Sequence, residues 1–430
     1  MSERVLRVGM LGCGTVGAAA IRLLHEHRED IARRAGCRLE VIRVAVRDPG
    51  RERDVPLPSE AFVADLMAVV EDPDVDIVCE LIGGVEPAGS LVLAAFDRDK
   101  PVVTANKELL ATRGRELFDA SDAKGIDLYF EAAVGGGIPL IRPLKESLTG
   151  ERLRRVMGIV NGTTNFILTR MSDEDRTFAD VLAEAQRLGY AEADPTADVE
   201  GHDAAAKCAI LASIAFNARV TASDVFREGI SRVTTEDIES ARRLGYVVKL
   251  LAIAEMDEDE RIAVRVHPAM IPSNHPLASV RDAFNAVFVE GPKVGELMFY
   301  GRGAGGDPTA TAVVGDLVSV ARNLLAEARG VGCTCFHERT IRPMAEMTGQ
   351  YYILLRVEDR PGVLAEIASV FGRNEVSIKS VWQEGTGEDA RLVFITHRAR
   401  EGAFQEAVAA LRDVPAVEEV RSILRVEAEE

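Results

Sequence analysis

A glycine-rich turn between a strand and a helix limits the start of this chain to few folds. The apolar run 4–11 leads into Gly12-Cys-Gly14-Thr-Val-Gly17, and a helical pattern follows at once. In this context Gly12 permits a tight turn, Gly14 lets the backbone approach a pyrophosphate, and Gly17 lets the helix pack closely on the strand. The helix N-terminus then holds the anion. We predict dinucleotide binding by Gly12, Gly14, Thr15, Val16 and Gly17, with a purely structural turn as the alternative.

Strand and helix patterns alternate through the first third of the chain. The strand-like runs are 39–46, 75–83, 100–107 and 126–132, and the helical patterns between them are 59–70, 90–98 and 109–125. Such alternation predicts a parallel sheet with helices on both faces. The expected fold class is therefore α/β, beginning with a Rossmann-type doubly wound sheet over residues 1–132.

From Pro139 the alternation stops, and the pattern changes twice more. Strand-like runs at 247–256, 261–271, 286–291 and 293–301 suggest a largely antiparallel sheet within an α+β substrate and dimerisation domain, residues 133–308. A long helix within 309–330 is expected to pack back on the nucleotide domain, and 331–348 is a linker. The tail, 349–430, has the β-α-β-β-α-β order of the ferredoxin-like class.

An acidic stretch precedes a helix in which a lysine is expected on the face that points to the protein interior. Glu192, Asp194, Asp198, Glu200 and Asp203 crowd a segment broken by Pro195 and Gly201, so an irregular loop is expected. Helical spacing then puts Asp203, Lys207 and Leu211 on one face, which carries Lys207 toward the interior. One interpretation is a buried Asp203–Lys207 ion pair. A second interpretation is a cleft in which carboxylates bind a cationic substrate and Lys207 donates or accepts a proton. A divalent metal site is a weaker interpretation, because the acids lack the ligand spacing of a calcium loop.

Further candidates follow the expected strands and glycine turns. Thr104 and Lys107 end a buried strand where a nicotinamide would lie, although a helix cap with an exposed lysine explains them equally well. Arg47 follows the second strand, where a guanidinium can accept a 2′-phosphate, so both NADP and NAD remain open. Gly303 and Gly305 are expected to touch the cofactor.

A run of glycines follows Glu131 at the end of another strand. Gly135 to Gly137 permit unusual backbone angles, which could aim nearby carbonyls inward. Together with Glu131, the carbonyls of Val134, Gly136 and Ile138 form an oxygen cluster for a hard monovalent cation. A hinge into the next domain is the alternative.

Composition excludes several classes of partner. The 430-residue chain is 47% apolar and 28% charged, as in globular proteins, and its net charge of −18 argues against nucleic acid or an anionic membrane. We therefore expect a small-molecule substrate and, without a leader or spanning segment, a cytoplasmic location. The six cysteines fit a reducing compartment. Cys333 and Cys335 are the only close pair, and they are a poor zinc signal.

These motifs together resemble the homoserine dehydrogenase family. The resemblance spans residues 4–330, and the tail resembles an ACT domain through Asp359-Arg-Pro-Gly362-Val-Leu364. The matching motifs are Gly12-x-Gly14-x-x-Gly17, Thr104-Ala-Asn106-Lys107, Phe130-Glu131-Ala-Ala-Val-Gly-Gly-Gly-Ile-Pro139, Asn161-Gly-Thr-Thr-Asn165, Gly189-Tyr-Ala-Glu192-Ala-Asp194-Pro195 and Glu200-Gly-His-Asp203-Ala-Ala-Ala-Lys207.

The resemblance implies interconversion of L-homoserine and L-aspartate 4-semialdehyde with NADP or NAD, in threonine, isoleucine and methionine biosynthesis. It implies Lys207 as acid/base with Lys107 assisting, and Glu192 and Asp203 on the substrate amino group. It further implies a sodium ion at Glu131, Val134, Gly136 and Ile138, and Gly189 beside the nicotinamide.

The resemblance also implies regulation. Threonine is the expected effector of the ACT domain, with Gly362, Asn374 and Ile378 as contacts, in a homodimer or homotetramer. Two further hypotheses remain: a Rossmann oxidoreductase for another amino or hydroxy acid, and a non-catalytic amino-acid sensor, which the two lysines disfavour.

Overall fold

The computed structural model describes residues 4–427 and divides into two compact units. The first unit is Met1–Val156, Ala206–Asp224 and Asn285–Arg339, and the second is Met157–Ala205, Val225–Phe284 and Thr340–Glu430. These units group the residues differently from the domains expected along the sequence. Each is described by itself below.

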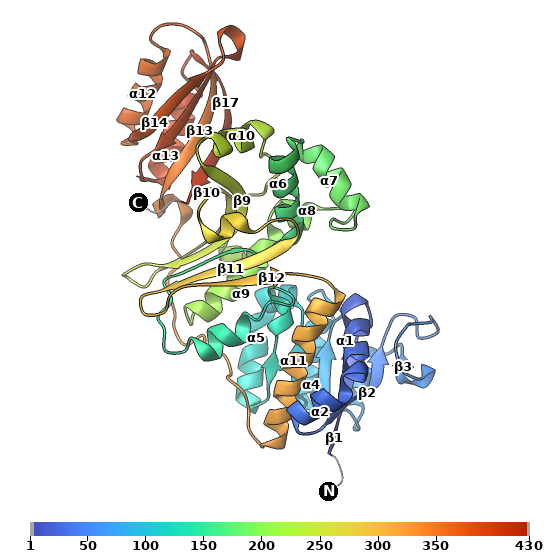
Figure 1. The fold of residues 1–430 in the computed structure, drawn as a ribbon. Coiled ribbons are helices and arrows are strands. Elements are labelled where there is room, and N and C mark those ends of the chain that lie inside the picture. Colours follow the sequence, from blue (N-terminus) through green and yellow to red (C-terminus); the bar gives the residue numbers. More distant parts are fainter. Residues whose placement is uncertain (1–3, 428–430) are drawn as a thin grey trace. The chain divides into compact units, whose positions relative to one another are not determined.

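The first unit contains a six-stranded sheet in the order β3-β2-β1-β4-β5-β6 (Figure 1). Every pair in it is parallel, so the sheet is the predicted doubly wound Rossmann type. The order reverses between β1 and β4, which is where such sheets bind dinucleotides. The strands are β1 (Val5–Leu11), β2 (Arg38–Ala45), β3 (Phe62–Val63), β4 (Ile77–Glu80), β5 (Val102–Thr104) and β6 (Leu128–Tyr129).

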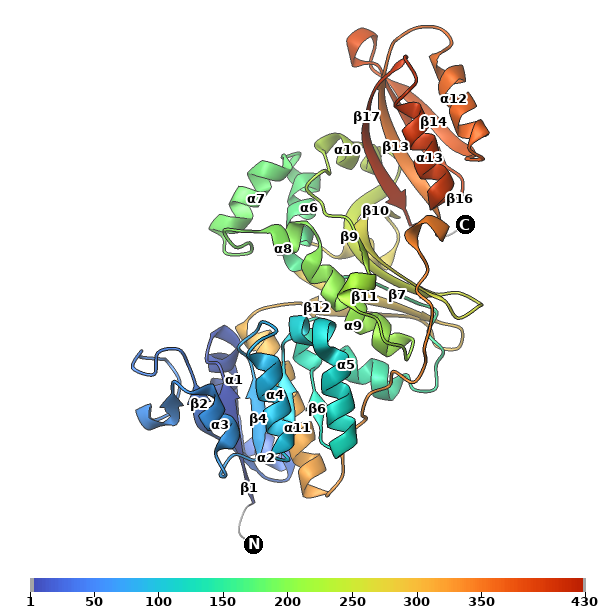
Figure 2. The same cartoon turned by 180° about the vertical axis from the view of Figure 1, so that it is seen from behind.

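Helices cover both faces of this sheet. One face carries α1 (Thr15–Glu26), α2 (Arg28–Ala35) and α11 (Gly306–Leu325), and the opposite face carries α3 (Leu66–Glu71), α4 (Ala88–Asp97) and α5 (Lys107–Lys124) (Figures 1 and 2). Buried side chains of α1, α2 and α11 share one apolar core with those of β1 and β4. The late helix α11 therefore packs on the nucleotide-binding sheet.

The helix predicted over 59–70 is confirmed only in its second half, where α3 begins at Leu66. The segment begins with a 3-10 turn, η1 (Ser59–Ala61), and continues into β3, whose Phe62 and Val63 pair with β2. Helix α3 starts only after Asp65, whose carboxylate caps it by accepting a hydrogen bond from the Met67 N–H. Strand pairing and this cap overrode the local helical pattern.

The rest of the first unit lies around the glycine run and the middle strands. It holds most of α9 (His202–Ala215) and, as neighbours in this order, β12 (Gly295–Arg302), β11 (Phe284–Gly291) and the start of β7 (Arg155–Ile159). The short helical turns are η2 (Glu131–Ala133), the π-helical η3 (Pro143–Ser147) and η4 (Ala222–Asp224).

The second unit has two long antiparallel strands at its centre, as the antiparallel prediction required. Strands β9 (Tyr246–Met256) and β10 (Ile262–Pro272) pair along their full length, and β8 (Phe226–Arg227) joins β10. The helices are α6 (Gly162–Glu174), α7 (Phe178–Arg187), α8 (Thr196–Val199), α10 (Thr235–Arg243) and the 3-10 turn η5 (Pro276–Ser279). The motif Asn161-Gly-Thr-Thr-Asn165 forms the first turn of α6, because the Asn161 side chain caps that helix.

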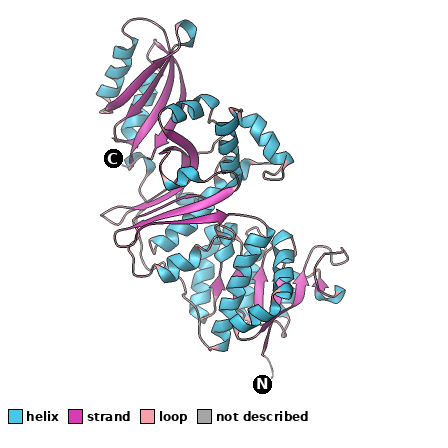
Figure 3. Ribbon diagram, viewed as in Figure 1, coloured by secondary structure: helices cyan, strands magenta, loops and turns pink. Residues whose placement is uncertain are grey.

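The C-terminal part has the predicted β-α-β-β-α-β order (Figure 3). Its sheet runs β17-β13-β15-β14, and its helices share one apolar core with the sheet. At the β17 edge, Ala269 and Met270 of β10 pair with Arg425 and Val426, so this part continues the sheet of the second unit. The elements are η6 (Met344–Glu346), β13 (Thr348–Val357), α12 (Val363–Arg373), β14 (Ile378–Glu384), η7 (Gly387–Asp389), β15 (Arg391–Thr396), β16 (Ala399–Arg400), α13 (Glu401–Leu411) and β17 (Val417–Val426).

Across residues 4–427, none of the helices is both long enough and apolar enough to span a membrane.

Candidate active site

The glycine loop after β1 has the geometry of a dinucleotide cradle. Gly12 has φ of +100°, and a Cβ there would lie 2.9 Å from the Leu81 carbonyl oxygen. A Cβ on Gly17 would lie 2.6 Å from the Gly12 carbonyl oxygen, whereas Gly14 has nothing within 4 Å. Packing therefore requires the first and third glycines, and open space beside the second admits a ligand at the N-terminus of α1. These residues fit a dinucleotide.

The carboxyl ends of β4 and β5 are tied together by Glu80, a residue that the sequence motifs did not single out. Glu80 is fully buried, and its carboxylate accepts hydrogen bonds from the Thr104 hydroxyl (2.6 Å) and the Ile82 N–H (2.9 Å). Asn106 caps α5, and its amide donates to the Gly84 carbonyl. Lys107 is thus the half-buried first residue of a fixed helix start. The sequence indicates Glu80 in one way: it is a carboxylate that follows valine and cysteine in an otherwise apolar strand.

The segment after β2 holds three arginines, of which Arg47 and Arg53 are candidates for cofactor binding. Arg47 is exposed, and Arg53 donates a hydrogen bond to the Asp48 carbonyl (2.8 Å) while lying 5.2 Å from the Phe62 ring centre. The charge of Arg53 also acts on Cys13 of the glycine loop, although burial dominates and raises the pKa of that thiol. Arg53 therefore adds a cation near the loop that no sequence motif indicated.

The Gly303 loop packs against the glycine run. Gly136 has φ of +55°, and a Cβ there would lie 2.5 Å from the Gly303 carbonyl oxygen. Gly303 is buried with Asn285 against it, whereas Gly305 is exposed and precedes α11. Close backbone approach already explains Gly303 without a cofactor, so its contact with the cofactor stays a prediction.

Glu131 binds backbone groups of its own neighbourhood. Its carboxylate accepts hydrogen bonds from the N–H groups of Leu140 (2.5 Å), Ile141 (2.8 Å) and Arg142 (2.9 Å). The Arg142 guanidinium lies 3.3 Å from the same carboxylate and 3.7 Å from that of Asp316. Burial and the charge of Glu131 raise the pKa of Asp316 to about 8. Glu131 therefore organises this loop by itself, and its carboxylate has few lone pairs left for a cation.

Asn161 joins two carboxylates of the acidic stretch. Its amide nitrogen donates to Asp198 (2.7 Å) and to Asp203 (2.9 Å), while its oxygen accepts from the Thr164 N–H at the start of α6. The stretch is mostly irregular, as predicted, apart from the single turn α8. Asn161 therefore fixes Asp203 in place. The sequence does not indicate this role, because Asn161 precedes Asp203 by some forty residues.

Glu192 and Gly189 belong to the loop that precedes this group in the chain. Both are exposed, and Gly189 has φ of +79°. The Gln186 side-chain amide donates a hydrogen bond to the backbone carbonyl of Glu192 (3.1 Å), and the Thr163 hydroxyl donates one to that of Tyr190 (2.7 Å). The structure thus anchors the backbone of the loop and leaves the Glu192 side chain at the surface.

Lys207 lies on α9, one helical turn after Asp203. Only 8% of Lys207 is exposed, which confirms that the helix carries this lysine inward. Within the first unit, Leu110 of α5 and Ile210 of α9 line one small pocket. Leu110 and Ile210 each lie three residues beyond a lysine, so both lysine-bearing helices border this pocket.

Asn165, the last residue of the Asn161 motif, has a structural role. Its amide nitrogen donates to the Asp282 carbonyl (2.9 Å), and its oxygen accepts from Lys249 (3.0 Å), which also binds the Val280 carbonyl (2.5 Å). Burial, followed by the charge of Arg281, lowers the pKa of Lys249 to about 8. This buried network ties α6 and β9 to the loop after η5.

We expect the free energy of unfolding to rise between pH 8 and pH 10 by about 1–3 kcal/mol through Lys249. The pKa of Lys249 is lower in the folded protein than its ordinary 10.5, so its contribution is present above 10.5 and is lost as the pH falls through about 8. Urea denaturation at both pH values measures the rise, which Lys249→Met should remove and Lys293→Met, at an exposed site, should retain. Equal pH dependence in the Lys249→Met variant would contradict the assignment.

The structure does not bring the three effector candidates together in one chain. Gly362 precedes α12 with φ of +95°, and Asn374 follows the same helix, about 18 Å away along its axis. The Asn374 amide donates to the Val370 carbonyl (2.8 Å), and Ile378 packs on the core beneath. One amino acid cannot touch both helix ends of a single copy.

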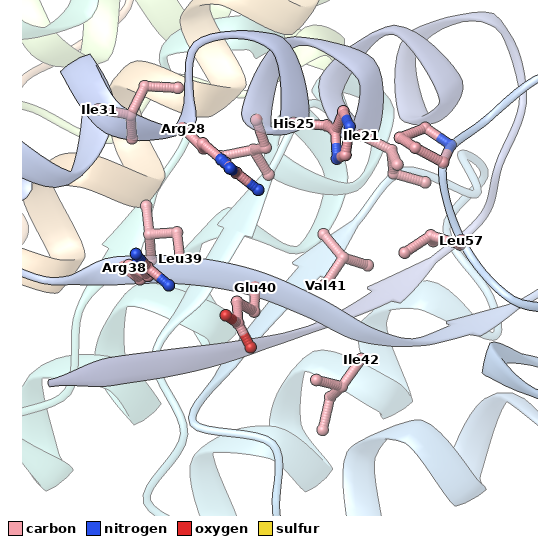
Figure 4. Close-up of a pocket in the computed structure, with 12 residues that line it drawn as sticks. Ile21, His25, Arg28, Ile31, Arg38, Leu39, Glu40, Val41, Ile42 and Leu57 are labelled. Atoms are coloured by element: carbon pink, nitrogen blue, oxygen red, sulfur yellow. The ribbon is translucent and has the colours of Figure 1, made fainter. Parts of the chain in front are cut away.

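A pocket of about 260 Å³ lies in the first unit away from the glycine loop (Figure 4). It is lined by residues from the C-terminal half of α1, the start of α2 and the N-terminal half of β2, including Arg28 of α2 with Arg38 and Glu40 of β2. The glycine loop lies at the opposite ends of α1 and β2, so this pocket is separate from the dinucleotide cradle.

Comparison with known proteins extends these observations to the whole chain. The protein-family model described as "Homoserine dehydrogenase, NAD binding domain" matches residues 12–131, "Homoserine dehydrogenase" matches 139–318, and "ACT domain" matches 351–416. The homoserine dehydrogenase of Corynebacterium glutamicum is 50% identical over 424 residues, covering 98% of this chain and 95% of that protein. The chain belongs to the homoserine dehydrogenase family.

Solved structures of homoserine dehydrogenases share its fold. That from Thiobacillus denitrificans has a TM-score of 0.93 and 43% identity, with 99% of each chain covered. A hyperthermophilic archaeal homoserine dehydrogenase in complex with NADPH has a TM-score of 0.65 and 28% identity, covering 76% of this chain and 99% of that one. This member of the family is an NAD(P)-dependent oxidoreductase with a C-terminal ACT domain.

Proposed function

We propose that the chain interconverts L-homoserine and L-aspartate 4-semialdehyde, with Lys207 as the residue that donates and removes the proton. The observation that carries this proposal is a lysine only 8% exposed, one turn beyond an aspartate that Asn161 holds in place. A buried ammonium is unusual unless it meets another charge or a substrate. Lys107, at the fixed start of α5, assists it.

The chemistry needs a cation at the substrate oxygen. The bound nicotinamide supplies or accepts the hydride. When the aldehyde is reduced, negative charge develops on its oxygen, and the Lys207 ammonium stabilises that oxygen and gives it a proton. In the reverse direction the neutral amine removes the proton of the alcohol.

The substrate also carries an α-ammonium group, which requires anionic partners. Asp203 supplies one, and the hydrogen bond from Asn161 fixes its orientation (2.9 Å). Glu192 supplies the second, from a loop whose backbone is anchored while its side chain is exposed. Gly189 belongs to the same loop and lines the nicotinamide pocket.

We infer that the enzyme uses NADP in preference to NAD. Arg47 and Arg53 follow β2, where the adenosine ribose of a dinucleotide lies in this fold. Both are cations suited to a 2′-phosphate. The relative in complex with NADPH supports this choice.

Arg47→Ala is expected to raise the KM for NADPH about tenfold, because a charge-assisted hydrogen bond to phosphate is lost, and to leave the KM for NADH unchanged. Steady-state kinetics with each cofactor measures the ratio. Arg51→Ala, an exposed neighbour, is the control. Equal changes for both cofactors would exclude a role in phosphate selection.

We further propose a sodium ion at the carbonyls of Val134, Gly136 and Ile138, with Glu131. The positive φ of Gly135 and Gly136 supports unusual carbonyl directions in this buried loop. Because the Glu131 carboxylate already accepts backbone hydrogen bonds, the carbonyls are the main ligands in this proposal.

The ACT domain supports regulation by an amino acid, and we propose threonine. Because Gly362 and Asn374 lie at opposite ends of α12, an effector that contacts both must lie between two copies of the chain. A homodimer or homotetramer is therefore part of this proposal. Adding threonine to the assay and measuring the oligomeric state with and without it test both parts.

A comparison of substrates tests the proposed reaction against the alternative oxidoreductase. We expect NADP reduction with L-homoserine and none with malate or saccharopine. Activity with malate or saccharopine in place of homoserine would favour the alternative, and binding of amino acids without any turnover would favour a sensor.

A further inference from the structure

The Cys-x-Cys loop after α11 lies against the first unit in a fixed conformation. Upstream, Gly330 N–H donates to Asp127 (2.8 Å), and Cys333 N–H donates to Asp122 (3.2 Å). Downstream, His337 N–H donates to the Asn217 carbonyl (3.0 Å). The loop between Cys333 and Cys335 is thus held on both sides.

The two thiols interact with each other and differ in character. The Cys335 N–H lies 3.4 Å from the Cys333 sulfur, and the Cys335 thiol also donates a hydrogen bond to it. These bonds, with the charge of Arg219, lower the pKa of Cys333, although burial and the charge of Asp122 oppose them. The bond to Cys333, followed by burial, raises the pKa of Cys335. Cys333 is therefore the more acidic thiol of the pair.

The surroundings of the pair are cationic and apolar. Lys145 is half-buried, and its ammonium lies 2.9 Å from the Val331 carbonyl and 5.4 Å from the Phe130 ring centre. Arg219 pairs with Asp119. A pocket of about 40 Å³ opens at both sulfurs between apolar side chains of α5 and α9, including Phe118 and Ile214. A space of this size holds a molecule little larger than water.

A zinc site or a disulfide with a third cysteine accounts for the pair less well than redox chemistry between the two thiols. In residues 4–427, no group of three or more His, Cys, Asp or Glu side chains could hold a metal ion, so Cys333 and Cys335 lack the further ligands of a zinc site. The remaining cysteines are not their disulfide partners, because the structure of residues 4–427 contains no disulfide. A low-pKa thiolate with a resolving thiol two residues away is the arrangement of a peroxide-reactive pair.

We propose that Cys333 and Cys335 form a peroxide-reactive dithiol. The Cys333 thiolate attacks one oxygen of hydrogen peroxide, an S–O bond forms as the O–O bond breaks, and the leaving hydroxide takes up a proton to become water. The sulfur is oxidised to a sulfenic acid and the peroxide is reduced. The Cys335 sulfur then displaces the hydroxyl as a second water and gives a disulfide.

Alkylation of the reduced full-length protein at pH 7 tests the first part. Iodoacetamide modification is followed by peptide mass mapping, and the tryptic peptide 330–339 carries both thiols. We expect Cys333 to react about tenfold faster than Cys13, whose pKa burial raises. A rate at Cys333 no higher than that at Cys13 would overturn the proposal.

Hydrogen peroxide tests the second part. The wild-type 330–339 peptide should lose the mass of two hydrogen atoms and regain it with dithiothreitol. Cys335→Ser should stop at a sulfenic acid that dimedone traps on Cys333, whereas Cys37→Ser should behave as the wild type. No mass loss in the wild type, or no dimedone adduct on Cys333 in the Cys335→Ser variant, would refute the dithiol.

Discussion

Replacing Lys207 by methionine is expected to lower kcat about a thousandfold, because the variant loses the proton donor and the positive charge at the substrate oxygen. Methionine keeps the length of the buried stem, so the fold and NADPH binding should persist. Turnover is measured by NADPH absorbance, and cofactor binding is measured separately by fluorescence titration.

Lys100→Met is the matched control for this experiment. Lys100 is buried to the same extent as Lys207, with 8% exposed, but its ammonium binds the Val70 (2.8 Å) and Asp72 (2.5 Å) carbonyls. The control should lose stability and keep kcat. If both variants lose kcat equally, burial of a lysine and not acid–base chemistry explains the effect.

Replacing Arg425 by methionine should lower the free energy of unfolding by about 3–5 kcal/mol, the cost of breaking a buried ion pair. The Arg425 guanidinium donates to Glu401 (2.8 Å) and to Glu228 (2.8 Å), and only 8% of the residue is exposed. Without it, Glu401 is left as a buried carboxylate. Chemical denaturation measures the loss.

Arg421→Met is the control, because Arg421 pairs with Glu236 from a partly exposed position (3.1 Å) and should cost at most about 1 kcal/mol. Equal losses in both variants would show that the buried position of Arg425 is unimportant.

The ion pairs around Arg425 also change the result that we expect when the ACT domain is removed. Residue Glu427 pairs with Arg265 of β10 (3.1 Å), and β17 continues the sheet of β10. A chain cut before residue 349 loses Arg425, the partner of Glu228, and leaves Arg265 its pair with Glu255 (2.9 Å). We therefore expect a destabilised second unit from such a cut, so point variants in the ACT domain are the better test of threonine regulation.

Local patterns predicted the features that depend on neighbouring residues. The glycine spacing after β1 indicated the cradle, and the i, i+4 spacing of Asp203 and Lys207 indicated that the lysine is buried. The repeated alternation of strand and helix indicated the parallel class of the first sheet. These features needed no knowledge of distant contacts.

Contacts between distant residues account for the features that local patterns could not show. Asn161 reaches Asp198 and Asp203 across the chain, and Glu80 reaches Thr104 on the next strand. The first half of the helix expected at 59–70 does not form, because Phe62 and Val63 pair with β2. Nothing local to those residues indicates such partners.

The most direct test of the central claim is NADPH consumption with L-aspartate 4-semialdehyde by the full-length protein. We predict saturable loss of NADPH absorbance that depends on the aldehyde and yields homoserine. No loss of NADPH with this aldehyde, from folded protein that binds NADPH, would contradict the proposed reaction.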